Sequence, residues 1–288
     1  MDNFWDDLNK HAIVYMNCDS PGMKDTLYYG GTGSKETVRF HLETVEDTLG
    51  EKEVERGKLT FESFRRPAKT GDQSFWGIGL PSLWGNTRPL PGKPYLGWWY
   101  HSAEDTPDKV DLPALEKALK MYGALIFRLC NSPVIPFEFV SYAQEFIEAL
   151  TDLQSKGKGT IELTPLINQA EALKGEAAKL DRTIGRMLKE GKPPQEFEAI
   201  NRCLMRLSRI LMPVGYTLVG KYDQDTYGRT ETTRPIPVLQ PTARLATLNP
   251  ESDDFKLLKT RLVRERNKVA DVLIEAKKLI KDTLQRVK

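Results

Sequence analysis

Apolar residues recur along the chain with two different spacings, and these spacings predict its helices and strands. Residues 11–18 form a short apolar run followed by turn-forming residues, which predicts a buried strand. Residues 34–49 repeat apolar side chains at steps of four and three, which indicates an amphipathic helix. A second short strand is expected over residues 79–84, a loop over 87–99, and a second helix over 111–129.

After residue 131 the pattern changes to long helical stripes. Helices are expected over residues 138–155, 164–190 and 252–286, with another that returns through Phe197 to Leu211. A connection rich in proline and threonine spans 213–250. The sequence therefore predicts an α/β domain over residues 1–131 and an all-α helical bundle over 132–288. The stripes suit a bundle core, and one exposed side suits a dimer face equally well.

Composition excludes several classes of protein. The 288 residues carry 42 basic and 40 acidic side chains, and no basic field is concentrated in one segment, which argues against nucleic-acid binding. No apolar stretch reaches the roughly 20 residues that span a bilayer, and the first residues lack a signal-peptide pattern, so the localisation stays open. Cys18, Cys130 and Cys203 are too far apart for a disulfide framework or metal knuckle and are expected to be buried thiols.

Two residues are candidates for metal chemistry. Asp19 follows the end of a predicted buried strand, where open α/β sheets place their ligands, although a turn role fits it as well. His101 lies in an aromatic-rich loop with Asp105 close by to orient its second ring nitrogen. The other histidines, His11 and His41, are expected to be structural or surface residues.

Three segments of the chain resemble consecutive blocks of the co-catalytic zinc exopeptidases of metallopeptidase family twenty-eight. They are residues 17–20 (Asn-Cys-Asp-Ser), 71–82 (Gly-Asp-Gln-Ser through Pro-Ser) and 100–111 (Tyr-His-Ser-Ala-Glu-Asp through Val-Asp). The continuation over residues 122–150, with Asn131-Ser132-Pro133, is similar to the junction between the peptidase and dimerisation domains in the glutamate carboxypeptidase II and transferrin receptor type. The resemblance covers essentially the whole chain and implies a partial three-layer sheet domain followed by a helical dimerisation domain.

The resemblance implies roles for individual residues. Asp19 would be a ligand of one zinc ion and His101 a ligand of the other, while Tyr100 would hydrogen-bond the tetrahedral intermediate. Gly71 and Asp72 would lie on the loop that faces the peptide substrate. Paired zinc ions in such enzymes polarise the scissile carbonyl and activate a bridging water.

The sequence also departs from the family pattern. The family's first histidine ligand, bridging aspartate, general-base glutamate and adjacent glutamate ligand all precede the strand that ends at Asp19. Only eighteen residues precede Asp19 here, and they contain neither His-x-Asp nor Glu-Glu. Each zinc would keep a single protein ligand, so this chain is expected to be the C-terminal part of an exopeptidase, inactive by itself.

Two other interpretations remain. The chain could be a non-catalytic dimerisation or scaffold module, comparable to the transferrin receptor, or a generic α/β and helical protein with chance similarity. A homodimer through the C-terminal helices is expected both for the exopeptidase part and for the scaffold module. Arg65, Arg66 and Arg88 match no motif, so the direction of peptide cleavage and the side-chain preference stay undetermined.

Overall fold

The computed structural model describes residues 2–50, 73–89, 97–219, 221–222 and 234–287 of the chain. The protein is mostly helical (67%), with a small three-stranded mixed sheet near the N-terminus and a helical bundle after it. It contains two compact units, which we call the sheet unit (Val14–Pro67 and Ser82–Ser132) and the helical unit (Met1–Ile13, Ala68–Pro81 and Pro133–Lys288). The division after Ser132 lies one residue beyond the predicted domain boundary, whereas the first thirteen residues group with the helical unit.

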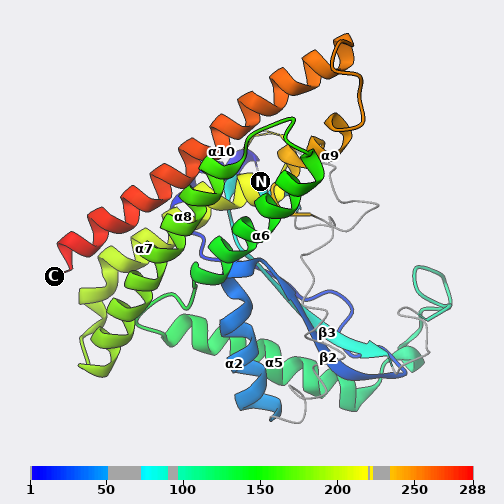
Figure 1. The fold of residues 1–288 in the computed structure, drawn as a ribbon. Coiled ribbons are helices and arrows are strands. Elements are labelled where there is room, and N and C mark those ends of the chain that lie inside the picture. The colour runs from blue at the N-terminus through cyan, green and yellow to red at the C-terminus, as the bar shows by residue number, and fades with distance from the viewer. Residues whose placement is uncertain (1, 51–72, 90–96, 220, 223–233, 288) are drawn as a thin grey trace. The chain divides into compact units, whose positions relative to one another are not determined.

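The sheet unit is built around a central strand. Its strands lie in the order β1 (Tyr15–Asn17), β3 (Ser82–Pro89) and β2 (Thr26–Gly33), as Figure 1 shows for β2 and β3. β3 runs parallel to β1 and antiparallel to β2. The strand predicted over residues 79–84 is therefore misplaced, because pairing begins at Ser82 and continues to Pro89, into the predicted loop.

The longer helices in the described part of the sheet unit are α2 (Val38–Leu49), which follows the short η2 (Lys35–Thr37), and α5 (Leu112–Asn131). Both predicted helices are confirmed. Asp111 caps α5, since its carboxylate accepts a hydrogen bond from the backbone N–H of Ala114 at 2.9 Å. The two helices share one hydrophobic core with the strands, formed by Tyr29, Phe40, Val45, Leu83, Met121 and Leu125.

His41 is buried in the sheet unit and is not a surface residue. Its ring is fully inaccessible, and its Nε2 lies 2.8 Å from the hydroxyl of Tyr29. Burial lowers the pKa of His41 to about 3, because the surrounding protein cannot solvate an imidazolium. Of the two roles expected for His41, the structural one is therefore confirmed and the surface one is wrong.

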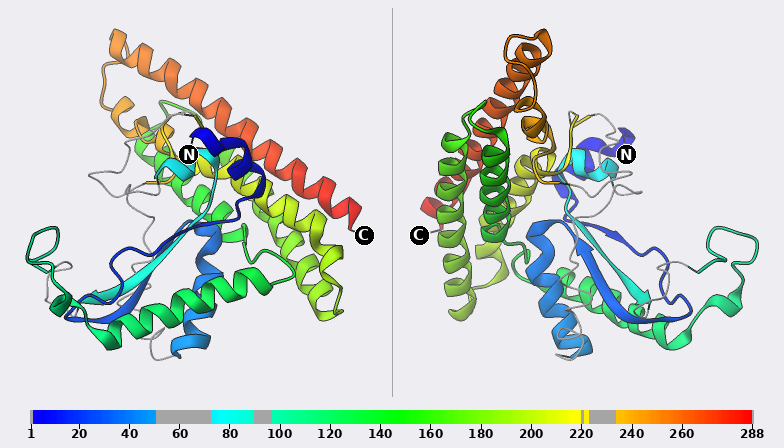
Figure 2. Two further views of the ribbon diagram at one scale, coloured as in Figure 1. Left: turned by 180° about the vertical axis from the view of Figure 1, so that it is seen from behind. Right: turned by 45° about the vertical axis from the view of Figure 1, so that its right-hand side comes forward.

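Among its described residues, the helical unit contains four long helices and several short ones. The long helices are α6 (Val140–Gly157), α7 (Thr164–Lys189), α8 (Glu198–Tyr216) and α10 (Asp253–Arg286), and the predictions for all four are confirmed. α7 packs against α6 and α10, and α10 also packs against α8 (Figure 2). Pro165 at the start of α7 and Gly191 after its end, at a φ of 65°, mark where this helix begins and the chain turns.

The apolar stripes of the bundle are its core. Along α7 the buried side chains are Leu166, Ala170, Leu173, Ala177, Leu180 and Met187. Along α10 they are Phe255, Leu262, Val269, Leu273, Ala276 and Ile280, with Thr283. The long connection predicted over 213–250 is partly structured, because α8 extends to Tyr216 and η6 (Pro237–Leu239) and α9 (Thr242–Leu245) follow.

Arg209 of α8 attaches two short N-terminal helices, α1 (Trp5–His11) and α4 (Gln73–Ile78), to the bundle. Its guanidinium donates to the carbonyl oxygens of Asn9 and Gly79, both at 2.9 Å, and also to those of Leu8 and Ala12.

The strand predicted over residues 11–18 is wrong over its first part. His11 ends an exposed helix and pairs with Asp7 at 2.8 Å, and only Tyr15–Asn17 enter the sheet.

The burial of the cysteines and the character of the helices test two further predictions from the sequence. Cys203 is buried as predicted, whereas Cys18 and Cys130 are exposed, so the expectation of three buried thiols is wrong for these two. None of the described helices combines the length and the apolar character needed to cross a membrane.

Candidate functional site

Asp19 lies in the turn that follows β1, the strand parallel to β3. Its backbone N–H donates to the side-chain oxygen of Asn17 at 3.0 Å, and its carboxylate accepts from the hydroxyl of Ser20 at 3.0 Å. Ser20 has a φ of 51° and Gly22 a φ of 73°, so the chain reverses sharply here. The carboxylate is exposed to solvent and has free coordination positions.

The turn after Asp19 is joined by backbone hydrogen bonds to the segment that follows His101. The N–H of Lys24 donates to the carbonyl of Lys109 at 2.8 Å, and the N–H of Asp111 donates to the carbonyl of Gly22 at 2.9 Å. Met23 and Val110 form an isolated antiparallel bridge between these bonds. The turn after Asp19 is thus anchored, within the sheet unit, to the segment that leads from the His101 loop into α5.

His101 is exposed at the surface of its loop and stacks on the preceding tyrosine. The ring centroids of Tyr100 and His101 lie 3.8 Å apart, with 24° between the ring planes. His101 has a φ of 61°, a left-handed conformation that is uncommon outside glycine, although histidine adopts it more often than most residues. The stacked tyrosine ring covers one face of the imidazole and leaves its ring nitrogens exposed to further partners.

The remaining predicted site residues are Asp105, Gly71 and Asp72. Asp105 is exposed, and its backbone N–H donates to the carbonyl of Ser102 at 3.2 Å. Within the part of the chain that the structure describes, Asp105 forms no hydrogen bond with His101, so this orienting contact stays a prediction. Gly71 and Asp72 lie outside the described residues.

The side chains that surround Asp19 and His101 do not complete a zinc site. No group of three or more histidine, cysteine, aspartate or glutamate residues with metal-binding geometry occurs among the described residues. A catalytic zinc needs about three protein ligands in addition to water. The donor set described here therefore does not fit the zinc pair that the family resemblance implies.

Sequence reasoning overlooked a second cluster of polar residues, on α8. Arg202, Arg206 and Arg209 recur at steps of four and three, which places them along one side of the helix. This spacing can be read from the sequence, but the apolar repeat of the same helix is the more regular pattern and was the one used to predict it. The three arginines border a groove in the helical unit, as described below.

Comparison with models of known protein families finds no match to this chain, and comparison with curated proteins finds none either.

Proposed function

We propose that this chain is the C-terminal part of a co-catalytic zinc exopeptidase of the glutamate carboxypeptidase type, and that it is inactive by itself. In this proposal the sheet unit carries one ligand for each zinc ion, Asp19 and His101, and the helical unit is the dimerisation domain. The remaining ligands and the general-base glutamate would come from a different stretch of polypeptide. The sheet would then be part of a larger three-layer sheet domain.

One observation supports this proposal most directly. The loop after Asp19 and the loop after His101 are hydrogen-bonded to each other, at Lys24 with Lys109 and at Gly22 with Asp111. Both candidate ligands are exposed, so they are accessible to further ligands from outside the described residues. Two exposed ligands on anchored loops are expected for half of a metal site, whereas a complete site would surround its ions.

Zinc content and exopeptidase activity of the purified chain test this proposal. We expect less than one tightly held zinc ion per chain after dialysis, and no release of amino acids from dipeptides or from N- or C-blocked peptides. Two bound zinc ions with turnover would refute the claim that the chain is inactive alone. Sequencing the coding region upstream of the Met1 codon and its neighbouring reading frames is the complementary test, because the proposal requires His-x-Asp and Glu-Glu segments there.

A non-catalytic scaffold is the alternative function, and the incomplete ligand set favours it. In this case the helical unit would act as a dimerisation module and Asp19 would serve only in its turn. Unrelated sequence upstream, together with a stable dimer that binds no zinc, would support the scaffold over the peptidase.

Both functions require a homodimer through the helical unit. Substitution of exposed apolar residues on α10 tests whether this dimer forms. Leu257 and Ile274 are 70% and 48% exposed, whereas Leu180 and Leu273 are buried in the bundle core. We expect Leu257→Asp or Ile274→Asp to convert a dimer into a folded monomer, measured by light scattering and circular dichroism. Leu273→Asp is the contrasting variant, since a charge in the core should unfold the bundle. A wild-type chain that is monomeric at high concentration would contradict the proposal.

A further inference from the structure

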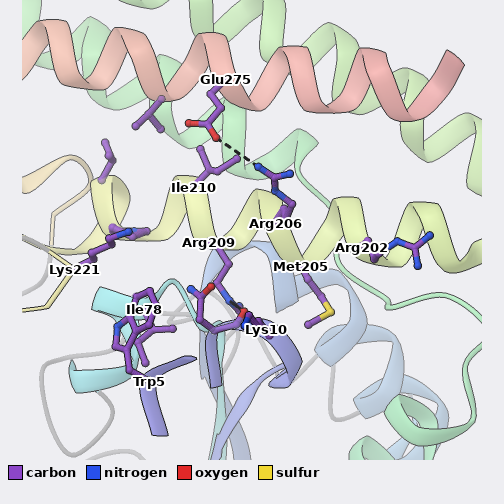
Figure 3. A pocket seen from close by; sticks show the side chains of 14 residues that line it. Trp5, Lys10, Ile78, Arg202, Met205, Arg206, Arg209, Ile210, Lys221 and Glu275 are labelled. Atoms are coloured by element: carbon purple, nitrogen blue, oxygen red, sulfur yellow. Dashed lines mark hydrogen bonds and ion pairs between the residues drawn. The ribbon is translucent and has the colours of Figure 1, made fainter. Parts of the chain in front are cut away.

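A groove of about 640 Å³ lies on the surface of the helical unit. Figure 3 shows α8 crossing the middle of this groove, with α10 on one side and α1 and α4 on the other. Pockets of about 300 to 1,000 Å³ are typical of sites for small organic molecules. The groove is thus large enough for such a ligand, and all its walls belong to one compact unit.

The ionisable side chains around the groove are mostly basic. Among the described residues, the lining comprises one carboxylate, Glu275, and five cationic side chains, namely Lys10, Arg202, Arg206, Arg209 and Lys221. Asp6 and Glu198 pair with Lys10 and Arg202, so the five cationic side chains face three carboxylates in all. The remaining excess of positive charge over a concave surface attracts anions.

Three of these cations remain available to a ligand, while two have structural contacts. Arg209 is held by the four backbone carbonyl groups described above. The ammonium of Lys221 lies over the rings of Trp5 and Tyr222, at 5.4 and 5.0 Å from their centroids. Lys10, Arg202 and Arg206 form surface ion pairs with Asp6, Glu198 and Glu275, at 2.6, 3.2 and 3.9 Å, and no other ion pair within the part of the chain that the structure describes. Such pairs are weak, so an incoming anion can compete for these three side chains.

The character of the groove changes along α8. Toward the N-terminus of α8 the groove is lined by Arg202 and Arg206. Toward the C-terminus of the helix it is lined by Ile210, Pro213 and Val214. The rise of 1.5 Å per helical residue gives a distance of roughly 18 Å between the two ends. A ligand that matches this order has an anionic group at one end and an extended apolar body.

We infer that this groove binds an amphipathic organic anion, such as a fatty carboxylate of medium chain length. The carboxylate contacts Arg202 and Arg206, with Lys10 nearby, and the alkyl chain lies over the apolar end of α8. The site is in the helical unit, so the inference does not depend on the function proposed for the sheet unit.

Calorimetric titration of the full chain with decanoate, below its micellar concentration, tests this inference. We expect saturable binding of one decanoate per chain, and binding at least tenfold weaker for decanol, decyltrimethylammonium and inorganic phosphate. The double variant Arg202→Gln/Arg206→Gln should weaken decanoate binding about tenfold, because both head-group contacts are removed. Arg261→Gln on the exposed side of α10 is the matched control and should change the affinity less than twofold.

Several outcomes would overturn the inference. Absence of decanoate binding would exclude the site, and equal binding of decanol would show that no cation selects the head group. An unchanged affinity in the double variant would place the binding elsewhere. Circular dichroism of the variants shows that any loss is not due to unfolding, because the substituted side chains are exposed.

Discussion

At the scale of single residues, Gly79 illustrates how closely the backbone of the helical unit approaches itself. A Cβ atom at this position would lie 2.5 Å from the Cα of Arg209 and 2.8 Å from the carbonyl oxygen of Ser208. Gly79 also has a φ of 83°, which side chains other than glycine rarely adopt. Only glycine therefore lets α4 end against α8 and lets the Gly79 carbonyl reach the guanidinium of Arg209.

We expect Gly79→Ala to destabilise the helical unit by at least about 2 kcal/mol, since the clash involves backbone atoms that cannot move independently. The matched control is Gly185→Ala in α7, where the added Cβ would have no atom within 4 Å. Alanine in a helix interior should stabilise the protein there by about 0.5 to 1 kcal/mol. Urea denaturation followed by circular dichroism measures both changes, and equal effects of the two substitutions would contradict the prediction.

His41 predicts a pH dependence of the free energy of unfolding. Burial lowers the pKa of His41 to about 3 in the folded protein, while an unfolded histidine titrates near 6.5. Between these values the unfolded chain binds the extra proton, so stability is full above pH 6.5 and is lost as the pH falls below it. The slope contributed by one proton is at most about 1.4 kcal/mol per pH unit.

Urea denaturation of the wild-type chain and of His41→Gln between pH 4.5 and 7.5 measures this contribution. We expect the variant to be less stable at pH 7.5, because it loses the Tyr29 contact, and to lose less stability on acidification. His11→Gln, which removes an exposed histidine, should retain the wild-type slope because it keeps the buried ring. Parallel pH profiles for the wild type and His41→Gln would show that His41 does not cause the dependence.

At the scale of elements, the N-terminus of α5 depends on one capping side chain. Asp111→Ala removes the acceptor for the N–H of Ala114 and should cost about 1 kcal/mol of stability. Asp111→Asn is the control, because its side-chain oxygen can still accept this bond, and it should lose only a small part of that amount. Thermal melting by circular dichroism distinguishes the two, and an alanine variant as stable as the asparagine variant would exclude a capping role.

The elements that the sequence predicted well are those defined by local interactions. α2, α5 and the long helices repeat apolar side chains every three or four residues. Three of them also begin at a local signal, because Asp111 caps α5, Pro165 stands in the first turn of α7 and Ser252 caps α10. The strands were predicted poorly because their limits depend on distant partners. Tyr15 pairs with Ser82, far along the chain, and no local pattern encodes where that pairing begins.

The same distinction applies to the candidate sites. The sequence predicts a candidate site in the sheet unit, because the residue types at Asp19 and His101 suit metal binding. The hydrogen bonds near these loops involve backbone groups, at Gly22, Lys24 and Lys109. Such bonds are invisible in a sequence, because any residue supplies them. The groove was missed for a related reason, since its walls come from α1, α4, α8 and α10, which tertiary packing alone assembles.

At the scale of the whole molecule, the two units have separate cores and different sensitivities. The sheet unit contains His41, whose protonation opposes folding, whereas Gly79 and Arg209 belong to the helical unit. Each unit should therefore respond to its own perturbation. We expect differential scanning calorimetry of the full chain to resolve two transitions, one for each unit.

The two perturbations assign these transitions. Lowering the pH from 6.5 to 5.5 should shift the sheet-unit transition downwards by roughly 4 to 8 °C. Protonation of the unfolded histidine over this interval removes about 1 kcal/mol of stability, because the group is already half protonated at pH 6.5, and a unit of this size shifts about 4 to 8 °C per kcal/mol. Gly79→Ala should instead lower the other transition at either pH, because the clash with Arg209 lies within the helical unit. A single transition that both changes move together would mean that the units unfold cooperatively, and the assignment of separate folding units would then be wrong.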